Sequence, residues 1–352
     1  MQINTKSKPF QIGINILLFG AGVFLLYLAF RKQNINEIFN AIANANLWMV
    51  IPVLVASVAG LAFRALRWKL IMEPLDIKPS FVNSFSSMMV GYAVNYAVPR
   101  VGEISRCVAL GKKENKPATS LFGTVMAERL ADLAMLGIVI SLTFFVNFDS
   151  IQYFFAENIF GPIGTFFKEK FFKNEIMTAI TLTGLALIGY LLFSYLKKNT
   201  QQTDEKLSDL DKMVDETWNG LTAFIQMKKW GLFIVYTLII WVANFFTSYL
   251  WLLSFEETKT FPLAAGITIY AISTVARSVP IQGGAMGAYH YLVTQGLATF
   301  GVGAVVGNAY AIVNHGSQMV LQLSLGAVCG LYLLLTKNKV AENVEQSEHL
   351  AS

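Results

Sequence analysis

Charged residues inside otherwise apolar stretches are the features of this sequence that could do chemistry. In the segment Asn95–Arg106 a proline and a glycine interrupt an apolar run, and charges then follow at intervals of three residues. If the chain turns helical after Pro99, then Arg100, Glu103 and Arg106 share one face and can pair in sequence. Next to membrane-spanning segments such charges are costly, and they usually face a water-filled cavity or a ligand. The segment therefore predicts a binding site.

Two further groups of charges lie within apolar runs. Arg64 and Arg67 are three residues apart, so they share a helix face, from which they either snorkel to the membrane surface or reach inward to an anionic head group. Glu128 lies about 15 Å from the start of its predicted helix, which is too deep for snorkelling. Asp132 follows one turn later and can pair with Arg129. These residues predict either a charged cavity wall or a self-neutralised structural clamp.

A second interrupted apolar stretch begins at Arg277 and continues through Pro280 to Gly283 and Gly284. It has neither the GxGxxG nor the Walker pattern of a phosphate loop. Small residues in a membrane segment often serve close helix packing, but beside an arginine and a proline break they also favour a head-group site. His290 has no partner at metal-ligand spacing, so we expect either a proton carrier or a hydrogen-bonded core histidine.

The composition is that of an all-α, polytopic integral membrane protein. Apolar residues make up 55% of the chain and charged residues only 14%, and several apolar runs reach the about 20 residues that cross a bilayer as a helix. Lysines and arginines lie between these runs, so the net charge of +5 indicates topology and not nucleic-acid binding. Two distant cysteines provide no disulfide framework. We expect no soluble catalytic domain, no metal and no cofactor.

We predict about eight membrane helices, including re-entrant or broken ones. The run 81–98 has basic residues on both sides, which favours a re-entrant path over an ordinary full span. A second broken element covers 261–300, either as a re-entrant hairpin or as two short spans. The unbroken predicted spans are 12–30, 48–70, 119–146, 176–196, 232–253 and 303–335.

A single membrane domain is expected over residues 1–340, followed by a disordered cytoplasmic tail at 341–352. Residues 199–230 form the one clearly polar, helix-patterned stretch, with apolar residues at helical spacing and acids opposite. We expect an amphipathic linker helix there that covers the cytoplasmic surface, a role we favour over partner binding. Basic residues beside the first and last spans predict that both termini are cytoplasmic.

The chain resembles the membrane region of the lysylphosphatidylglycerol synthase/flippase family. The resemblance covers nearly the whole chain and rests on the order and spacing of four motifs, which are Arg64-Ala-Leu-Arg67-Trp68, Asn95 to Arg106, Glu128-Arg129-Leu-Ala-Asp132 and Pro280-Ile-Gln-Gly283-Gly284. It implies about eight helices with re-entrant elements, and movement of a phospholipid or polyprenyl-phosphate-type lipid across the membrane.

Two departures from the family pattern matter. The aminoacyl-transferase domain of the full synthases is missing, which argues against lysyl-lipid synthesis. Ala288-Tyr289-His290 stands where many relatives have an acid after the glycines, so a role that depends on that acid does not carry over to this chain.

The sequence thus predicts a non-enzymatic translocase of an anionic lipid in the bacterial cytoplasmic membrane. Arginine suits phosphate through its planar donor fork, and acids at depth can exchange protons or counter-charge. The expected head-group contacts are Arg64, Arg67, Asn95, Arg100, Arg106, Arg277, Gly283 and Gly284. The expected charge partners are Glu103, Glu128, Arg129, Asp132 and His290. The rival hypotheses are an intramembrane lipid-modifying enzyme and a non-catalytic membrane partner of a cell-envelope enzyme, and a homo-oligomer is compatible with each.

Overall fold

The computed structural model describes residues 24, 27, 29–30, 33–98, 100–147, 161, 204–278 and 282–336, without the side chains of 204–210 and 282–284. Most of the predicted span 12–30, the whole predicted span 176–196 and the predicted tail 341–352 lie outside these residues. Every regular element within them is helical. The α-helices are α2 (Ile35–Asn44), α3 (Val50–Met72), α4 (Phe81–Ala97), α5 (Val101–Glu114), α6 (Ala118–Val146), α10 (Asp204–Gln226), α11 (Trp230–Leu252), α12 (Leu263–Arg277), α13 (Gln282–Ala298) and α14 (Ala304–Leu335).

Four helical stretches within the described residues are long and apolar enough to cross a bilayer. They are Leu47–Leu75, in which short 3₁₀ turns flank α3, and Ala118–Val146, Trp230–Leu252 and Ala304–Leu335, while Leu263–Arg277 is a shorter apolar helix. Each long stretch begins and ends within a few residues of a predicted span. The prediction of an all-α polytopic membrane protein is therefore confirmed.

Helices α4 and α5 form a hairpin that enters and returns on the same side. Near the start of α4, Asn83 Nδ2 donates to Glu114 Oε1 at 2.9 Å, at the end of α5. Tyr332, near the end of α14, donates to Asn83 Oδ1 at 3.3 Å. With 17 and 14 residues, these helices extend only about 21 to 26 Å, short of the roughly 30 Å hydrocarbon core. The geometry is that of a re-entrant element.

The turn of this hairpin, whose described residues 95–98 and 100–103 we call tip 1, is fixed by local contacts. Arg100 adopts a left-handed backbone conformation with φ 67°, which reverses the chain direction. Asn95 Oδ1 accepts the backbone N–H of Gly102 at 2.8 Å. A Cβ atom at Gly102 would stand 2.0 Å from the carbonyl oxygen of Gly91, so only glycine permits this approach of α4 and α5.

Helices α12 and α13 form a second hairpin, and we call the described residues on either side of its turn, 277–278 and 282–285, tip 2. Phe261 precedes α12 and Phe300 follows α13, and their ring centroids are 5.8 Å apart. The two ends of the hairpin therefore lie together. Since α12 has 15 residues and α13 has 17, neither spans the hydrocarbon core at about 1.5 Å per residue. Of the two paths that the sequence leaves open for 261–300, the structure has the hairpin.

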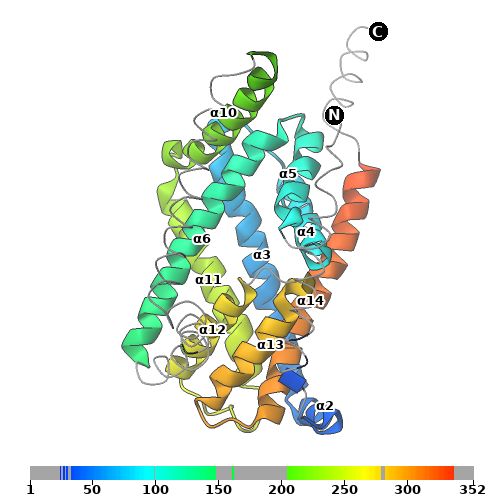
Figure 1. The fold of residues 1–352 in the computed structure, drawn as a ribbon, viewed down its shortest axis with the longest axis vertical. Coiled ribbons are helices and arrows are strands. Elements are labelled where there is room, and N and C mark those ends of the chain that lie inside the picture. Colours follow the sequence, from blue (N-terminus) through cyan, green and yellow to red (C-terminus); the bar gives the residue numbers. More distant parts are fainter. Residues whose placement is uncertain are drawn as a thin grey trace, which may run out of the picture.

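The two halves of the described fold repeat one arrangement upside down (Figure 1). A long helix, a hairpin and a second long helix follow one another twice, as α3, α4–α5, α6 and as α11, α12–α13, α14. Contacts from Ser57 to Thr247 and from Arg67 to Thr237 show that α3 and α11 pack antiparallel. In Figure 1 the first hairpin enters from the end where α10 lies, and the second from the end where α2 lies. Both tips therefore point toward the middle.

Helix α10 lies at one end of the molecule and packs closely along α6 (Figure 1). A Cβ atom at Gly123 would stand 2.1 Å from the backbone oxygen of Thr217, and one at Gly220 would stand 2.1 Å from that of Ser120. The packed face is thus set by small residues, as in close membrane helix pairs. Part of the apolar stripe identified in the sequence faces outward instead, since Val214 and Trp218 are 64% and 62% exposed.

Candidate substrate-binding site

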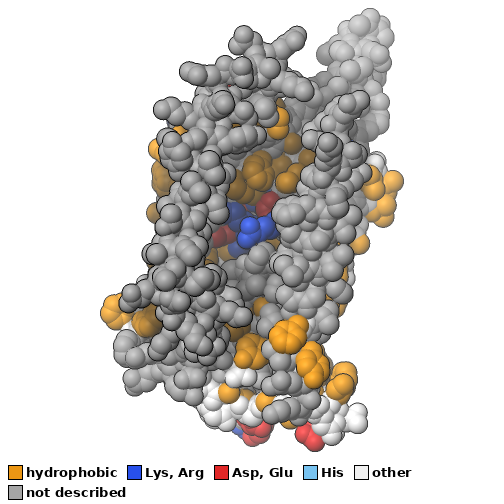
Figure 2. All heavy atoms as spheres, in the orientation of Figure 1, with side chains coloured by type: hydrophobic (Ala, Val, Ile, Leu, Met, Phe, Trp, Pro, Cys, Tyr) orange, Lys and Arg blue, Asp and Glu red, His pale blue; other side chains and the backbone are white. Residues whose placement is uncertain are grey.

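A cavity of about 520 Å³ lies between the two hairpin tips and the long helices. Its size falls in the range typical of small-molecule sites. Figure 2 shows basic and acidic side chains within a hollow near the middle of the long axis, away from both ends. Charged groups at that depth are unusual in a membrane protein and generally serve a function.

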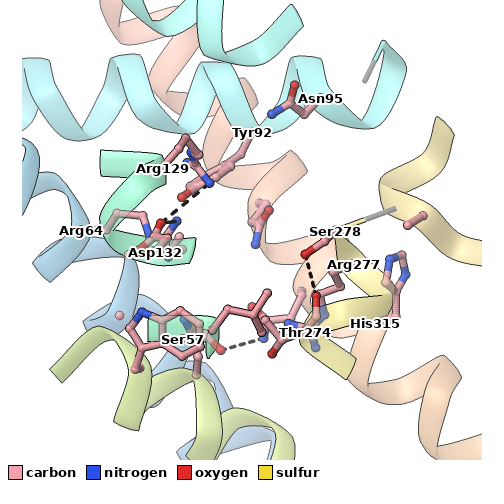
Figure 3. Close-up of a pocket in the computed structure, with 18 of the residues that line it drawn as sticks. Ser57, Arg64, Tyr92, Asn95, Arg129, Asp132, Thr274, Arg277, Ser278 and His315 are labelled. Atoms are coloured by element: carbon pink, nitrogen blue, oxygen red, sulfur yellow. Dashed lines mark hydrogen bonds and ion pairs between the residues drawn. The ribbon is translucent and has the colours of Figure 1, made fainter. Parts of the chain in front are cut away.

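Seven of the predicted site residues line this cavity, together with several aromatic and amide side chains. The seven are Arg64, Asn95, Arg100, Glu103, Arg129, Asp132 and Arg277. Figure 3 shows Arg64, Arg129 and Asp132 gathered beside Tyr92 on one side, and Arg277 beside His315 on the other. The seven come from α3, α4, the start of α5, α6 and α12, and Arg64 and Arg277 stand 213 positions apart in the sequence. Side chains from both halves of the described fold thus converge on one cavity.

Three other predicted residues lie behind this lining, in the protein wall. Glu128 is completely buried and joins two arginines, accepting from Arg67 Nη2 at 3.0 Å and from Arg106 Nη2 at 2.7 Å. The guanidinium of Arg67 also lies over the ring of Phe233, and that of Arg106 lies over Trp68. Opposite charges and aromatic faces make this burial tolerable. We call Arg67, Glu128 and Arg106 the wall triad.

Asp132 connects the wall triad to the cavity. Its Oδ1 accepts from Arg67 Nη2 at 2.8 Å, and its Oδ2 lies 3.4 Å from Arg64 Nη1. The pairing with Arg129 expected from their spacing is long, at 3.9 Å. One carboxylate therefore touches a buried arginine on one side and two cavity-lining arginines on the other.

From the sequence we expected ion pairs along one helix face, among Arg100, Glu103 and Arg106. The structure has different partners. Arg106 pairs with Glu128 on α6, and no ion pair joins Glu103 to either arginine within the described part of the chain. Contact between α5 and α6 outweighs the weak attraction of neighbours on one helix. Arg100 and Glu103 are left to face the cavity.

Arg277 reaches the cavity from tip 2, held by an aromatic residue. Its guanidinium carbon lies 5.0 Å from the ring centroid of Tyr289, and Nη2 donates to the Tyr289 hydroxyl at 3.3 Å. That hydroxyl also accepts from Asn314 Nδ2 at 2.8 Å. Among the described residues Arg277 has no carboxylate within ion-pair distance. Its position is fixed by stacking and hydrogen bonding, and its charge is not neutralised by them.

Comparison with known proteins agrees with the motifs. Residues 12–326 match the family described as lysylphosphatidylglycerol synthase TM region. The chain belongs to this family. Over 116 residues it is 29% identical to the protein named UPF0104 membrane protein MJ1595, from Methanocaldococcus jannaschii, an alignment that covers 32% of this chain and 34% of that relative. The match thus spans about a third of the relative's length. No solved structure matches the chain.

The remaining predicted residues of this family member, Gly283, Gly284 and His290, lie on α13. Gly283 and Gly284 lie in its first turn, and Ala285 follows with φ 64° and lines the cavity. His290 is buried off the cavity, with Nδ1 donating to the carbonyl oxygen of Met286 at 2.6 Å. That is the geometry of the hydrogen-bonded core histidine that we weighed against a proton carrier.

Apart from Asn95, sequence reasoning did not include the uncharged side chains of the cavity lining among the candidate site residues. Tyr289, which holds Arg277, lies where the family resemblance led us to expect an acid. Tyr92 and Trp241 line the cavity, but aromatic residues are too common in membrane helices to mark a site by themselves. Asn314 and His315 on α14 stand out in the sequence as polar residues in an apolar span, but we did not include them among the candidate site residues.

Proposed function

We propose that this protein is a lipid translocase, which carries the head group of an anionic lipid through the central cavity while the acyl or prenyl chains stay in the bilayer. The observation that carries the proposal is the excess of arginine over acid in a cavity at mid-depth. Four arginines and two acids line it. Arginine binds phosphate oxygens through a planar fork of donors, so a phosphate-bearing lipid fits this lining.

The inverted arrangement of the two hairpins supports transport. Repeats of opposite orientation with interrupted helices at mid-membrane are typical of transporters that open alternately to the two sides. Here one hairpin enters from each end, and both tips contribute arginines to one cavity. Rocking of either hairpin would open the same site to one leaflet or the other.

Apolar side chains around the cavity support a lipid as the ligand. Leu133 lines the cavity and is 64% exposed. On tip 1 and the start of α5, Val101 and Ile104 alternate with the lining residues and are 40% and 54% exposed. A soluble anion would gain nothing from these side chains, whereas a lipid chain can lie against them.

We further propose that the protein resides in the bacterial cytoplasmic membrane with its α10 end in the cytoplasm. Lys69, Lys112 and Lys116 lie at or near this end of α3 and α5, as the positive-inside tendency requires. The lipid would leave chemically unchanged, since the role of the cavity is to bind and release. A second copy of the chain or a cell-envelope enzyme is compatible with this role.

Leaflet exchange in reconstituted liposomes tests the proposal. The purified protein is placed in vesicles with fluorescent phosphatidylglycerol, phosphatidic acid or a polyprenyl phosphate, and exchange is read by chemical quenching of the outer leaflet. We expect exchange with at least one anionic lipid and far less with phosphatidylcholine. Arg129→Gln should slow it, because this arginine lines the cavity, while its one ion pair among the described residues, with Asp132, is long at 3.9 Å and contributes little to folding.

Lys229→Gln is the matched control, because it also removes one cation from a partly exposed pair, with Glu73 at 2.8 Å, far from the cavity. It should exchange lipid as the wild type does. Absence of exchange for every lipid, by folded protein, would reject the translocase. A change in lipid mass during the assay would instead support the enzyme hypothesis. Loss of a cellular phenotype on disrupting α10, with Arg129→Gln harmless, would support the partner hypothesis.

A further inference from the structure

We infer that the head group taken into the cavity ends in a phosphate monoester, which carries about two negative charges at neutral pH and three free oxygens. Ordinary phospholipids are diesters, with a single charge and two free oxygens. The inference rests on the proposed function and names the substrate class of the same cavity.

The net positive charge of the cavity lining favours a doubly charged head group. Its arginines exceed its acids by two, the members being Arg64, Arg100, Arg129 and Arg277 against Glu103 and Asp132. The wall triad adds two arginines and one acid behind them. Uncompensated charge in a low-dielectric interior is expensive. A singly charged head group leaves part of the excess unmatched, while a doubly charged one neutralises the lining.

Within the described part of the chain, the lining arginines that have no ion pair lie on the two hairpin tips. Asp132 is already shared by Arg64, Arg67 and Arg129. The lining arginines without an ion pair among the described residues are Arg100 on tip 1 and Arg277 on tip 2. Each hairpin tip thus brings to the same cavity one guanidinium that has no carboxylate partner among the described residues. Three phosphate oxygens can accept from both tips and from the Arg64–Arg129 side together, which two oxygens serve less well.

Arg277 is held in one orientation before any ligand binds. Stacking on Tyr289 and the hydrogen bond through Nη2 fix the plane of its guanidinium. Tyr289 is itself completely buried and fixed by Asn314. A cation held in place before the ligand arrives loses little side-chain entropy on binding, and this raises both affinity and discrimination.

Competition binding in detergent, read by native mass spectrometry, tests the inference. The probes are dioctanoyl phosphatidic acid, dioctanoyl phosphatidylglycerol, dioctanoyl phosphatidylcholine and the tail-free monoester glycerol 3-phosphate. We expect phosphatidic acid to bind about tenfold more tightly than phosphatidylglycerol, because the extra charge adds charge-assisted hydrogen bonds. Phosphatidylcholine and glycerol 3-phosphate should bind weakly.

Arg277→Gln should reduce binding of phosphatidic acid about tenfold and of phosphatidylglycerol much less, so that the preference shrinks. Lys78→Gln is the control, since it removes an exposed lysine whose partner is Asp76 on the α3–α4 connection. It should leave the preference intact. If Arg277→Gln does not fold, Arg100→Gln on the exposed tip 1 makes the same test, and the wild-type preference stands as a measurement by itself.

Equal or tighter binding of phosphatidylglycerol would overturn the monoester inference and leave the translocase proposal in place. Glycerol 3-phosphate binding as tightly as phosphatidic acid would keep the monoester chemistry but reject a lipid as its source, and with it the proposed function. If the preference for phosphatidic acid over phosphatidylglycerol persists in both Arg277→Gln and Arg100→Gln, the inference is also overturned, because these two guanidinium groups would then not discriminate between the lipids.

Discussion

Replacing Glu128 by glutamine is the sharpest test of the charge arrangement. This carboxylate is completely buried and holds two arginines, Arg67 at 3.0 Å and Arg106 at 2.7 Å. Glutamine has nearly the same shape but no charge, and its amide nitrogen would stand against one of the arginine donors. Arg67 keeps Asp132 at 2.8 Å. Arg106 keeps only the face of Trp68 among the described residues.

The expected loss is about 3–5 kcal/mol, the typical cost of leaving a buried charge without its partner. A pair of unit charges about 4 Å apart interacts by about 4 kcal/mol at an effective dielectric of 20, so two pairs make this figure reasonable even after local relaxation. At about 2 °C per kcal/mol, the unfolding midpoint in detergent should fall by roughly 6 to 10 °C. Lipid exchange should fall with it.

The double variant Glu128→Gln with Arg106→Gln separates charge from shape. It removes one acid and one arginine of the wall triad together, so no new excess of charge is buried. We expect it to be more stable than the sum of the two single losses by about 0.5–3 kcal/mol, the usual size of coupling between contacting residues. A midpoint for Glu128→Gln within about 2 °C of wild type, or additive losses in the double variant, would refute the account of the wall triad.

Three further outcomes are expected. Ordinary overpacking costs about 1–3 kcal/mol, and Gly102→Ala should cost more, because its Cβ would stand 2.0 Å from the Gly91 oxygen. Thermal unfolding measures this loss of stability. Arg100→Gly should raise stability by about 1 kcal/mol, since φ 67° is strained for arginine, yet slow lipid exchange by removing a free cation. Asp132→Asn should tighten phosphatidic acid binding and slow lipid exchange, because the lining gains net positive charge. Binding and exchange assays on the same preparation measure both, and weaker binding or faster exchange would contradict the expectation.

The sequence predicted the fold well where hydrophobic length decides it. The long spans end where apolar runs meet charge, and basic residues on both flanks of 81–98 were enough to predict a hairpin. The packed face of α10 was not predictable from its apolar stripe. Backbone contact at Gly123 and Gly220 decides that face, and glycine carries no hydrophobic signal.

Ten of the thirteen predicted site residues lie in the cavity lining or in the wall behind it, but the sequence did not predict which residue belongs to which layer. Arg64 and Arg67 share a face by spacing, yet three residues turn a helix by about 300°, which leaves them about 60° apart. That angle puts Arg64 in the cavity lining and Arg67 in the wall. The partner of Arg106 lies on another helix, so no rule of local spacing could choose Glu128 over Glu103.

If the protein is a translocase as proposed, the contacts of Asp132 account for how the empty site tolerates an excess of arginine and how it would still release an anion. Through Oδ1 it stays bound to Arg67 in the wall, and through Oδ2 it neutralises part of the charge of Arg64. A phosphate that binds Arg64 and Arg129 competes with the weaker of these contacts, at 3.4 and 3.9 Å, and not with the 2.8 Å contact to the wall. In the proposed translocase the carboxylate would thus serve as an internal counter-ion that returns to the lining arginines as the ligand leaves. Such exchange lowers the free-energy cost of the empty, charged cavity at mid-membrane. A transporter must return to this empty state once in every cycle.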